Sequence, residues 1–388
     1  MALFAPSART FDLDLDRAAT TPLHPEVFEA MAPWFGVAGA NPSSLHGGGR
    51  AARKAVEDAR ERVAAAVGVA PGEVVFTSGA TEADQLGVLG VLAARRGGHV
   101  VASRAEHAAV LRAVEHAGAH GHPVSWVDPE KDGRLDPERV AAAMRPDTAL
   151  VATMLVNNET GARTDVRAIA DVAHAHGAWL LCDAVQALGY EGVDRHALGA
   201  DLLAVSAHKI EGPVGVGALV VDPRVPLVAQ ALGGAQERGR RAGTTPTALV
   251  VGFGAAAARA ADDPVGRGAR VAAVRDRFEA EVLRLPGVHR SIPVAGRGPK
   301  HAHLRVDGLG REGAETLLVN LDGDGVWASA GSACAAGSLE PSHVLLAMGW
   351  GREEARGALR FAFGDDHERA DAEEAAARFA RALQRTRA

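Results

Sequence analysis

The sequence predicts an α/β protein with a large, mostly parallel sheet domain and a smaller α+β domain. Over the first two thirds of the chain, short apolar runs alternate with longer segments of helical periodicity. Several of the runs are continuously apolar, as strands covered on both faces usually are. Strands that alternate with helices in this way are typical of an open sheet with helices on both sides. After about Gly254 the order of the elements changes, which indicates the second domain.

The individual elements follow from these patterns. Strands are expected at 74–77, 99–102, 150–156, 179–182, 202–206 and 217–221, with helices at 50–67, 81–94 and 166–176. The second domain is expected to contain helices at 255–285, 311–321, 343–349 and 366–383 and strands at 303–306, 326–328 and 358–363. We therefore expect a large domain of residues 21–255 and a small domain of residues 1–20 and 256–388.

The composition excludes several classes of protein. The 388 residues carry 42 basic and 48 acidic side chains and no strongly basic block, so nucleic acid and membranes are poor candidates as direct partners. The N-terminus lacks the basic start and apolar core of a signal peptide, and no apolar stretch is long enough to cross a bilayer. The two cysteines, Cys182 and Cys334, predict free thiols rather than a disulfide framework. These features predict a cytoplasmic protein.

Two charged residues directly follow expected strands. Lys209 ends the run Ser-Ala-His-Lys after the strand at 202–206, and Asp183 follows the strand at 179–182. Open α/β sheets bind ligands at the carboxyl ends of their strands, where partial burial favours a neutral amine that can form a Schiff base. A carboxylate there can face the protonated nitrogen of a pyridine ring. Taken singly, each residue has an ordinary alternative, namely a loop lysine and a helix-capping aspartate.

A phosphate site is indicated at 77–82, where a strand is followed by a small-residue turn and the start of a helix. Free backbone N–H groups and the helix dipole attract an anion there, and the segment lacks the sequence marks of an ATP or dinucleotide loop. His107 could stack on a planar ring, and Asn158 could contact a ring hydroxyl. Alone, such a histidine is more often a surface or core residue, and the asparagine more often part of a plain turn.

The two cysteines lie in different settings. Cys182 belongs to an apolar strand, where structural cysteines are common. Cys334 is surrounded by Ser, Ala and Gly at 329–338, which indicates a mobile loop that can carry a reactive thiol. The Gly-, Arg- and Thr-rich segment 231–247 indicates a second long loop, and loops of that length are usually functional or disordered.

Together, these motifs resemble the cysteine desulfurases of the class V aminotransferase group, within the fold-type I enzymes that use pyridoxal 5'-phosphate (PLP). The resemblance covers nearly the whole chain, and the motifs occur in the family's order. The further motifs lie at 16–22, 41–46, 106–107, 157–161, 183–186, 233–244, 331–334 and 342–345.

The resemblance implies a role for each motif. Lys209 holds PLP and removes the Cα proton of the substrate, and Asp183 pairs with the pyridine nitrogen. His107 stacks on the ring and, with Lys209 and Cys334, belongs to the expected catalytic residues. The other implied cofactor contacts are those of Asn158 and Gln186 near the ring hydroxyl, and of Ala80, Thr81, Ser206, His208 and, from the second chain of a homodimer, Thr244 at the phosphate. Arg360 takes the substrate carboxylate, assisted by Asn41 and Asn158. No metal is implied.

The same resemblance implies the reaction. L-cysteine is converted to L-alanine, and its sulfur passes to Cys334 as a persulfide. An acceptor protein, most closely one of iron–sulfur cluster assembly or tRNA thiolation, then takes the sulfur, and a DNA-sulfur system stays open as the acceptor. The chain departs from the common family pattern at several positions without removing a group that this mechanism needs: Arg17, Gln85, Glu211, Pro246 and 364–366.

Other functions stay open from the sequence. A selenocysteine lyase or an aminotransferase of the same fold would use the same pocket, with Cys334 incidental. A non-catalytic sulfur carrier is disfavoured by the presence of Lys209 and Asp183. A nicotinamide-dependent oxidoreductase is disfavoured because no Gly-x-Gly-x-x-Gly motif follows a first strand.

Overall fold

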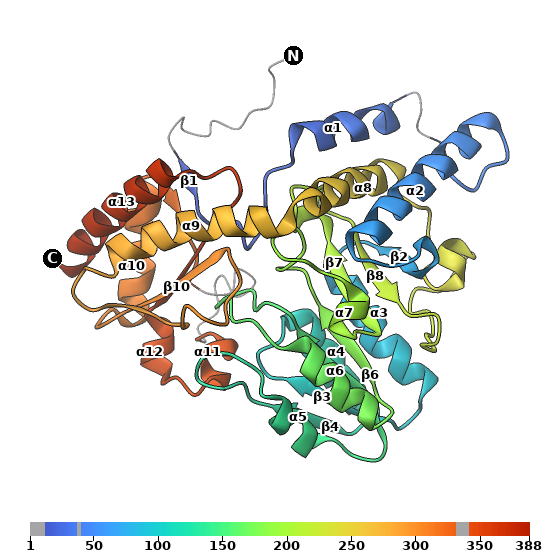
Figure 1. Ribbon diagram of the computed structural model, residues 1–388, viewed down its shortest axis with the longest axis horizontal. Helices are drawn as coiled ribbons and strands as arrows, with labels where there is room; N and C mark the ends of the chain where they lie inside the picture. The colour runs from blue at the N-terminus through green and yellow to red at the C-terminus, as the bar shows by residue number, and fades with distance from the viewer. Residues whose placement is uncertain (1–11, 37–39, 331–340) are drawn as a thin grey trace.

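The computed structural model describes residues 12–36, 40–330 and 341–388. Two groups of elements lie side by side, one built on a seven-stranded sheet and the other on a three-stranded sheet (Figure 1). The predicted α/β class is confirmed by this arrangement.

The large sheet has the strand order β2-β8-β7-β6-β5-β3-β4. Its strands are β2 (Val74–Thr77), β3 (His99–Ser103), β4 (Val124–Val127), β5 (Thr148–Met154), β6 (Trp179–Asp183), β7 (Leu202–Ser206) and β8 (Gly217–Val221). The run from β7 to β4 is parallel throughout, and β8 is antiparallel to both β7 and β2. The sheet is therefore mostly parallel, as predicted. The edge strand β4 was not predicted, because its half-buried residues give no continuous apolar run.

Helices cover both faces of the large sheet. Successive strand residues point to opposite faces, so Val75 joins the core beneath α3 and α4, while Val74 and Phe76 join the core on the other side. The helices of the first face are α3 (Ala80–Ala94) and α4 (Ala108–Ala119). The helices that contribute to the second face are α1 (Pro25–Met31), α2 (Gly47–Ala66), α5 (Pro137–Ala143), α6 (Val166–Ala175), α7 (Arg195–Leu198) and α8 (Thr247–Asp262). Burial on both faces explains why the strands are continuously apolar.

The smaller group is built on an antiparallel sheet with the order β12-β10-β9. Its strands are β9 (Val288–Arg290), β10 (His301–Val306) and β12 (Ala358–Ala362), beside a parallel pair of β1 (Leu13–Asp14) and β11 (Val326–Trp327). Its helices are α9 (Pro264–Val282), α10 (Gly310–Gly323), α11 (His343–Ala347), α12 (Arg352–Arg356) and α13 (Arg369–Arg387). Leu304 and Phe361 share the core beneath α9 and α13, so His303 and Arg360, on alternate positions, occupy the opposite face of the sheet.

The single helix predicted at 255–285 is wrong, because the chain breaks between α8 and α9. Asp263 adopts φ −149° and ψ 66°, and its side chain accepts a hydrogen bond from the Gly266 N–H at 2.9 Å. Pro264 cannot continue the preceding helix, since it lacks an N–H group and restricts the residue before it. Buried residues of α8 join the core of the large sheet and those of α9 join the core of the small sheet. This change of core supports the two-domain division, which we propose for the chain.

Short 3-10 turns complete the described elements: η1 (Ala32–Phe35), η2 (Pro71–Glu73), η3 (Ala207–Lys209) and η4 (Gln236–Gly239). Among the described residues, no helix is both long enough and apolar enough to cross a membrane.

Candidate active site

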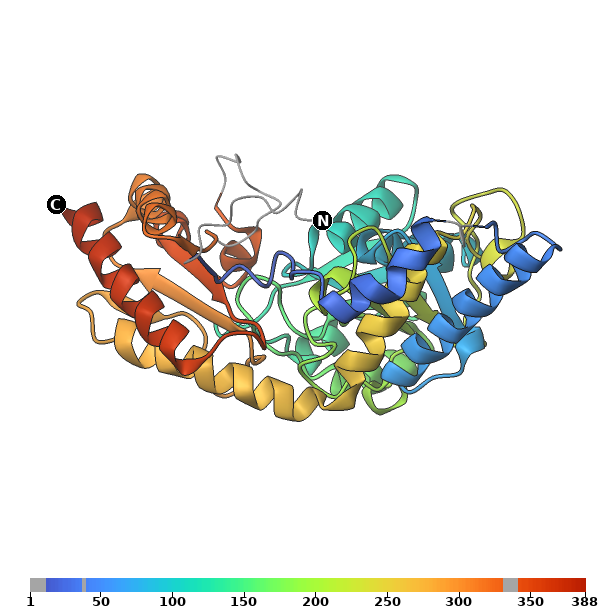
Figure 2. The ribbon, with the colours of Figure 1, turned by 90° about the horizontal axis from the view of Figure 1, so that it is seen from above.

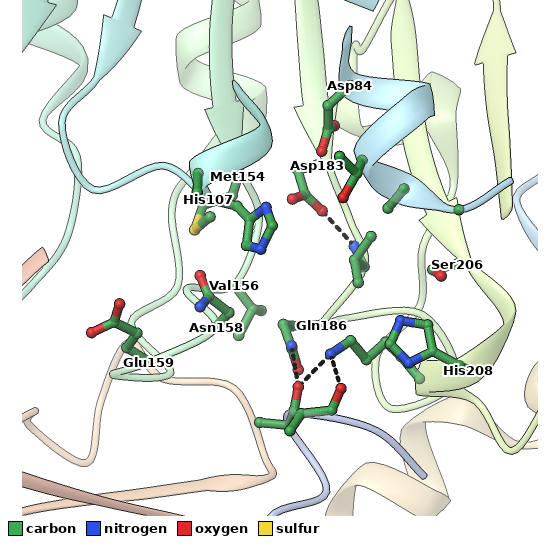
Figure 3. Close-up of a pocket in the computed structure, with 18 of the residues that line it drawn as sticks. Asp84, His107, Met154, Val156, Asn158, Glu159, Asp183, Gln186, Ser206 and His208 are labelled. Carbon is green, nitrogen blue, oxygen red and sulfur yellow. Dashed lines mark hydrogen bonds between the residues drawn. The ribbon is translucent and has the colours of Figure 1, made fainter. Parts of the chain in front are cut away.

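The parallel strands of the large sheet end at one edge, and a cavity of about 360 Å³ opens there. Ten of the residues singled out in the sequence line it: Ala80, Thr81, His107, Asn158, Asp183, Gln186, Ser206, His208, Lys209 and Arg360. Most of them lie at the ends of β2, β3, β5, β6 and β7 or in the turns that follow, whereas Arg360 comes from β12 of the small sheet. Figure 3 labels six of them around the cavity: His107, Asn158, Asp183, Gln186, Ser206 and His208.

Lys209 ends η3, directly after β7, and its amine crosses the cavity to another part of the chain. Its Nζ donates to the carbonyl oxygen of Ala18 at 2.5 Å and to that of Ala19 at 2.6 Å. The Nε2 of Gln186 donates to the same Ala18 oxygen at 3.0 Å, as the dashed lines in Figure 3 show. Backbone acceptors near the N-terminus therefore hold the amine of a residue that lies about two hundred positions later.

These acceptors belong to residues 14–21, here named the N-terminal strap, which runs between the two sheets (Figure 2). At one end the N–H of Arg17 donates to Ala362 O in β12, and at the other the N–H of Thr21 donates to His208 O at 2.9 Å. The Arg17 guanidinium pairs with Asp366 at 2.5 Å and with Asp14 at 2.9 Å. Arg17 and Asp366 both depart from the family pattern, and the structure pairs them with each other.

Arg360 is buried beside the strap and is partly engaged there. Its Nη2 lies 2.6 Å from a carboxylate oxygen of Asp16, and its Nη1 donates to the carbonyl oxygen of Asn158 at 2.8 Å. Its Nε is buried and has no hydrogen-bond partner among the described residues. The side chain is thus fixed at the cavity wall with capacity to bind a further acceptor, as recognition of a carboxylate requires.

Asp183 ends β6 with its carboxylate in the cavity wall. One carboxylate oxygen accepts the N–H of Val185 at 2.9 Å. Asp183 therefore caps the backbone with one oxygen, and its second oxygen is not used in this hydrogen bond. Burial raises the pKa of Asp183, against the opposing effects of His107, the Val185 hydrogen bond and Lys209. Burial, and then the charge of Asp183, likewise raise the pKa values of Asp84 and Glu106 well above their usual range. A cationic group bound against Asp183 would stabilise its ionised form.

His107 follows β3 and forms the N-cap of α4. Its Nδ1 accepts a hydrogen bond from the N–H of Ala109 at 3.1 Å, so the ring is both a cap and a cavity residue. Burial first, and then the neighbouring charges of Lys209 and His343, lower the pKa of His107 against the attraction of Asp183. The ring is therefore neutral over more of the physiological pH range than an exposed histidine.

The turn between β2 and α3 forms the other end of the cavity. Gly79 has φ 155°, and a Cβ added there would meet no atom within 4 Å, so this side of the turn is open. The N-terminus of α3 follows at Ala80, and the buried Oγ of Ser206 has no hydrogen-bond partner among the described residues. Burial, together with the charges of Lys209 and Lys300, lowers the pKa of His208 to about 4. A helix N-terminus beside a buried hydroxyl that has no partner among the described residues favours an anion.

The cavity fits PLP on the evidence of its unsatisfied polar atoms. Asn158 Oδ1, Gln186 Oε1 and Ser206 Oγ are all buried, line the cavity and have no hydrogen-bond partner among the described residues. Buried polar groups of this kind normally have partners, so they indicate a polar ligand. PLP offers a hydroxyl, an aldehyde, a ring nitrogen and a phosphate, which match these atoms, Lys209, Asp183 and the turn at Gly79. The described residues contain no group of three or more His, Cys, Asp or Glu side chains arranged to hold a metal.

Three predicted residues are not seen in the cavity. Thr244 is exposed in a neighbouring recess, which shares Ser78 and Gly215 with the cavity wall. Asn41 is exposed before α2, and its side chain accepts the N–H of Ser43 at 2.9 Å. Cys334 lies outside the described residues. The roles expected for these residues stay predictions.

The structure also brings residues to the cavity that the sequence reasoning did not assign: Asp84, Glu159 and His343. Asp84 is fully buried on α3 and interrupts an otherwise apolar helix face, which was the one sequence signal available for it. Glu159 lies in the motif at 157–161, and His343 opens α11 in the motif at 342–345. Both were quoted for the resemblance but received no role.

Comparison with known proteins identifies the family. Residues 14–374 match the model of the class-V aminotransferases. The chain is 41% identical over 362 residues to the cysteine desulfurase IscS of Anaeromyxobacter dehalogenans, a match that covers 90% of this chain and 87% of the relative. The chain belongs to the cysteine desulfurases of the class-V aminotransferase family. These enzymes depend on PLP.

Other members of the family agree with this assignment. The cysteine desulfurase IscS of Dictyoglomus turgidum is 39% identical over 353 residues, covering 90% of this chain and 89% of the relative. The solved structure of a NifS-like protein superposes with a TM-score of 0.90 at 28% identity and covers 96% of this chain and all of that protein. Both the sequence and the fold of nearly the whole chain are therefore those of the family.

Proposed function

We propose that the protein converts L-cysteine to L-alanine and transfers the sulfur to Cys334 as a persulfide, from which an acceptor protein takes it. The observation that carries the proposal is that Lys209, Asp183 and Arg360 line a single cavity. The amine, the carboxylate and the guanidinium match the aldehyde of PLP, its ring nitrogen and the carboxylate of an amino acid. The desulfurase relatives support cysteine as that amino acid.

The residues of the cavity divide the work between binding and proton transfer. When bound, PLP supplies an electron sink for the bond that breaks at the substrate carbon. Asp183 would pair with the ring nitrogen, and Arg360 would orient the substrate carboxylate. The Lys209 amine moves protons at the substrate carbon, and the Ala18 and Ala19 carbonyls hold it across the cavity.

We propose a homodimer in which Thr244 completes the site of the second chain. Much of the segment 231–247 around Thr244 is exposed, and it includes Leu232 at 86% exposure, while Val214, which lines the cavity, is 71% exposed. Contact with a second copy would bury such side chains, and closed two-fold dimers are the commonest oligomers. We propose the cytoplasm as the compartment, because a sequence with only two cysteines has no disulfide framework.

The test is to incubate the purified holoenzyme with L-cysteine and to measure alanine, followed by mass spectrometry of the protein. We expect stoichiometric alanine and sulfide in the presence of a thiol, and one added sulfur on the peptide that contains Cys334. Parallel reactions with L-selenocysteine and with amino-group acceptors separate the alternatives. The proposal would be contradicted if selenocysteine were turned over faster while cysteine left no sulfur on the protein. Formation of a keto acid would also contradict it.

A further inference from the structure

Glu82 lines the cavity but has no role in the function proposed above. It lies in the first turn of α3, and its carboxylate pairs with Arg241, which belongs to the segment 231–247. The Nε of Arg241 donates to one oxygen of Glu82 at 2.8 Å, and its Nη2 donates to the other at 3.1 Å. A two-point contact of this kind fixes direction as well as distance. The segment that carries Thr244 is therefore tied to the start of α3.

The same carboxylate also holds the turn between β2 and α3, where the cavity favours an anion. Its Oε2 accepts the backbone N–H of Ser78 in that turn at 2.7 Å. Burial opposes the ionisation of Glu82, but the hydrogen bonds from Arg241 and Ser78 outweigh it and lower the pKa of Glu82. Glu82 is therefore charged at neutral pH, and it joins the turn to a residue that lies 159 positions away from it.

A second ion pair ties the segment 231–247 to the strand that enters the same turn. Glu237 of the segment accepts the N–H of Phe76 in β2 at 2.9 Å and pairs with the buried guanidinium of Arg60 at 2.7 Å. Both ties thus end on backbone N–H groups, one in the strand and one in the turn. The position of the segment and the shape of the turn are set by the same contacts.

A simpler explanation of the pair between Glu82 and Arg241 is a stabilising contact with no effect on the cofactor. Two observations favour a larger role. The carboxylate bonds a backbone N–H of the turn in addition to the arginine. At the other end, only Ala242 and Gly243 separate Arg241 from Thr244, which is exposed in the recess beside the turn. The contact therefore connects the anion-binding end of one cavity to the residue that is free to reach a second chain.

We propose that Glu82 is a positioning residue that couples the two cofactor sites of the homodimer. This inference rests on the proposed function, in which Thr244 completes the site of the second chain. A phosphate bound at the turn orders that turn, and Glu82 passes the order through Arg241 to the segment of the same chain. Thr244 then reaches the second site already positioned. Because coupling between two sites is reciprocal, PLP at either site favours binding at the other.

The test is to remove PLP from the holoenzyme and to titrate it back, with the absorption of the bound cofactor as the readout and light scattering to verify the dimer. We expect the second PLP to bind about tenfold more tightly than the first, which gives a Hill coefficient of about 1.5. Glu82→Ala and Arg241→Ala should each lower the coefficient to about 1, and the double variant should lower it no further, because both residues act through one contact. In Arg241→Ala the first PLP should bind within about threefold of the parent, since Glu82 still holds the turn.

A matched control is Glu191→Ala. Glu191 also pairs with an arginine at 2.8 Å, and it is 17% exposed against 25% for Glu82, but it lines a different recess. This variant should keep the coefficient of the parent.

A parent dimer with a coefficient of about 1, or an Arg241→Ala dimer that keeps about 1.5, would overturn the inference. If Glu82→Ala does not fold, the result for Arg241→Ala still decides. An active monomer would overturn the inference together with the shared site of the proposed function. A cooperative dimer that forms no alanine from cysteine would contradict the proposed reaction alone.

Discussion

The buried ion pair between Arg60 and Glu237 allows a sharp test of how the loop before Thr244 is held. Arg60 Nη1 and Nη2 lie 2.7 and 2.9 Å from the two oxygens of Glu237, and the two side chains are only 4% and 5% exposed. The same carboxylate accepts the N–H of Phe76 in β2 at 2.9 Å. Glu237 and Arg238 also adopt left-handed backbone angles, with φ 46° and 57°, which non-glycine residues keep only when their surroundings enforce them.

We expect Glu237→Gln to lower the free energy of unfolding by about 3–5 kcal/mol, because it removes the only one of the two carboxylates paired with Arg60 that is itself buried. Urea denaturation followed by circular dichroism measures this change. Glu57→Gln is the matched control, since Glu57 pairs with the same arginine at 3.2 Å but is 46% exposed. It should cost less than about 1 kcal/mol. Equal losses in the two variants would refute the reasoning from burial.

Four further outcomes are expected. Lys209→Ala should lose the borohydride-reducible cofactor linkage and alanine formation, and a near-normal rate would remove Lys209 from its role. Mixing inactive Lys209→Ala and Thr244→Ala chains should restore about a quarter of parental activity, because half of the dimers are hybrids with one intact site each, and a fully active monomer would contradict the shared site. Cys334→Ser should keep the cofactor but gain no sulfur in mass spectrometry, whereas Cys182→Ala should stay active because burial raises the pKa of Cys182 well above its usual value. Burial, and then Arg360, lower the pKa of His303 to about 3 in the folded protein. As the pH falls below about 6.5, His303 therefore takes up a proton in the unfolded chain but not in the folded one, and the free energy of unfolding decreases. That loss should be about 2 kcal/mol between pH 7.5 and 5, and a urea titration of His303→Asn that shows the full pH dependence of the parent would refute it.

The sequence predicted the large sheet well because burial on both faces leaves a strong apolar signal in β5, β6 and β7. The signal fails where burial is incomplete, as in the edge strand β4. It also failed at Asp263-Pro264, although the break has a local cause that can be read in the sequence. There the apolar periodicity on both sides outweighed a single proline in the interpretation.

The candidate site was predictable where a functional side chain follows a strand. Lys209, Asp183 and His107 reach one cavity because parallel strands end at one edge. The contacts made by the backbone were not predictable, since no residue type marks them. The two carbonyl oxygens that hold Lys209 and the pairing of Arg17 with Asp366 depend on the path of the chain, which brings positions far apart in sequence together.

The hold on Lys209 has a practical consequence for anyone who transplants this chemistry to another scaffold. Its acceptors are the peptide oxygens of Ala18 and Ala19, which every amino acid possesses. A search that compares side chains alone would overlook them, and point mutation cannot delete them. The feature to copy is the path of the N-terminal strap. Arg17 bonds it to the small sheet and Thr21 bonds it to the residue before Lys209, so that the Ala18 and Ala19 carbonyl groups reach the Lys209 amine. A scaffold that received only the side chains would lack the two carbonyl oxygens to which the Lys209 amine donates.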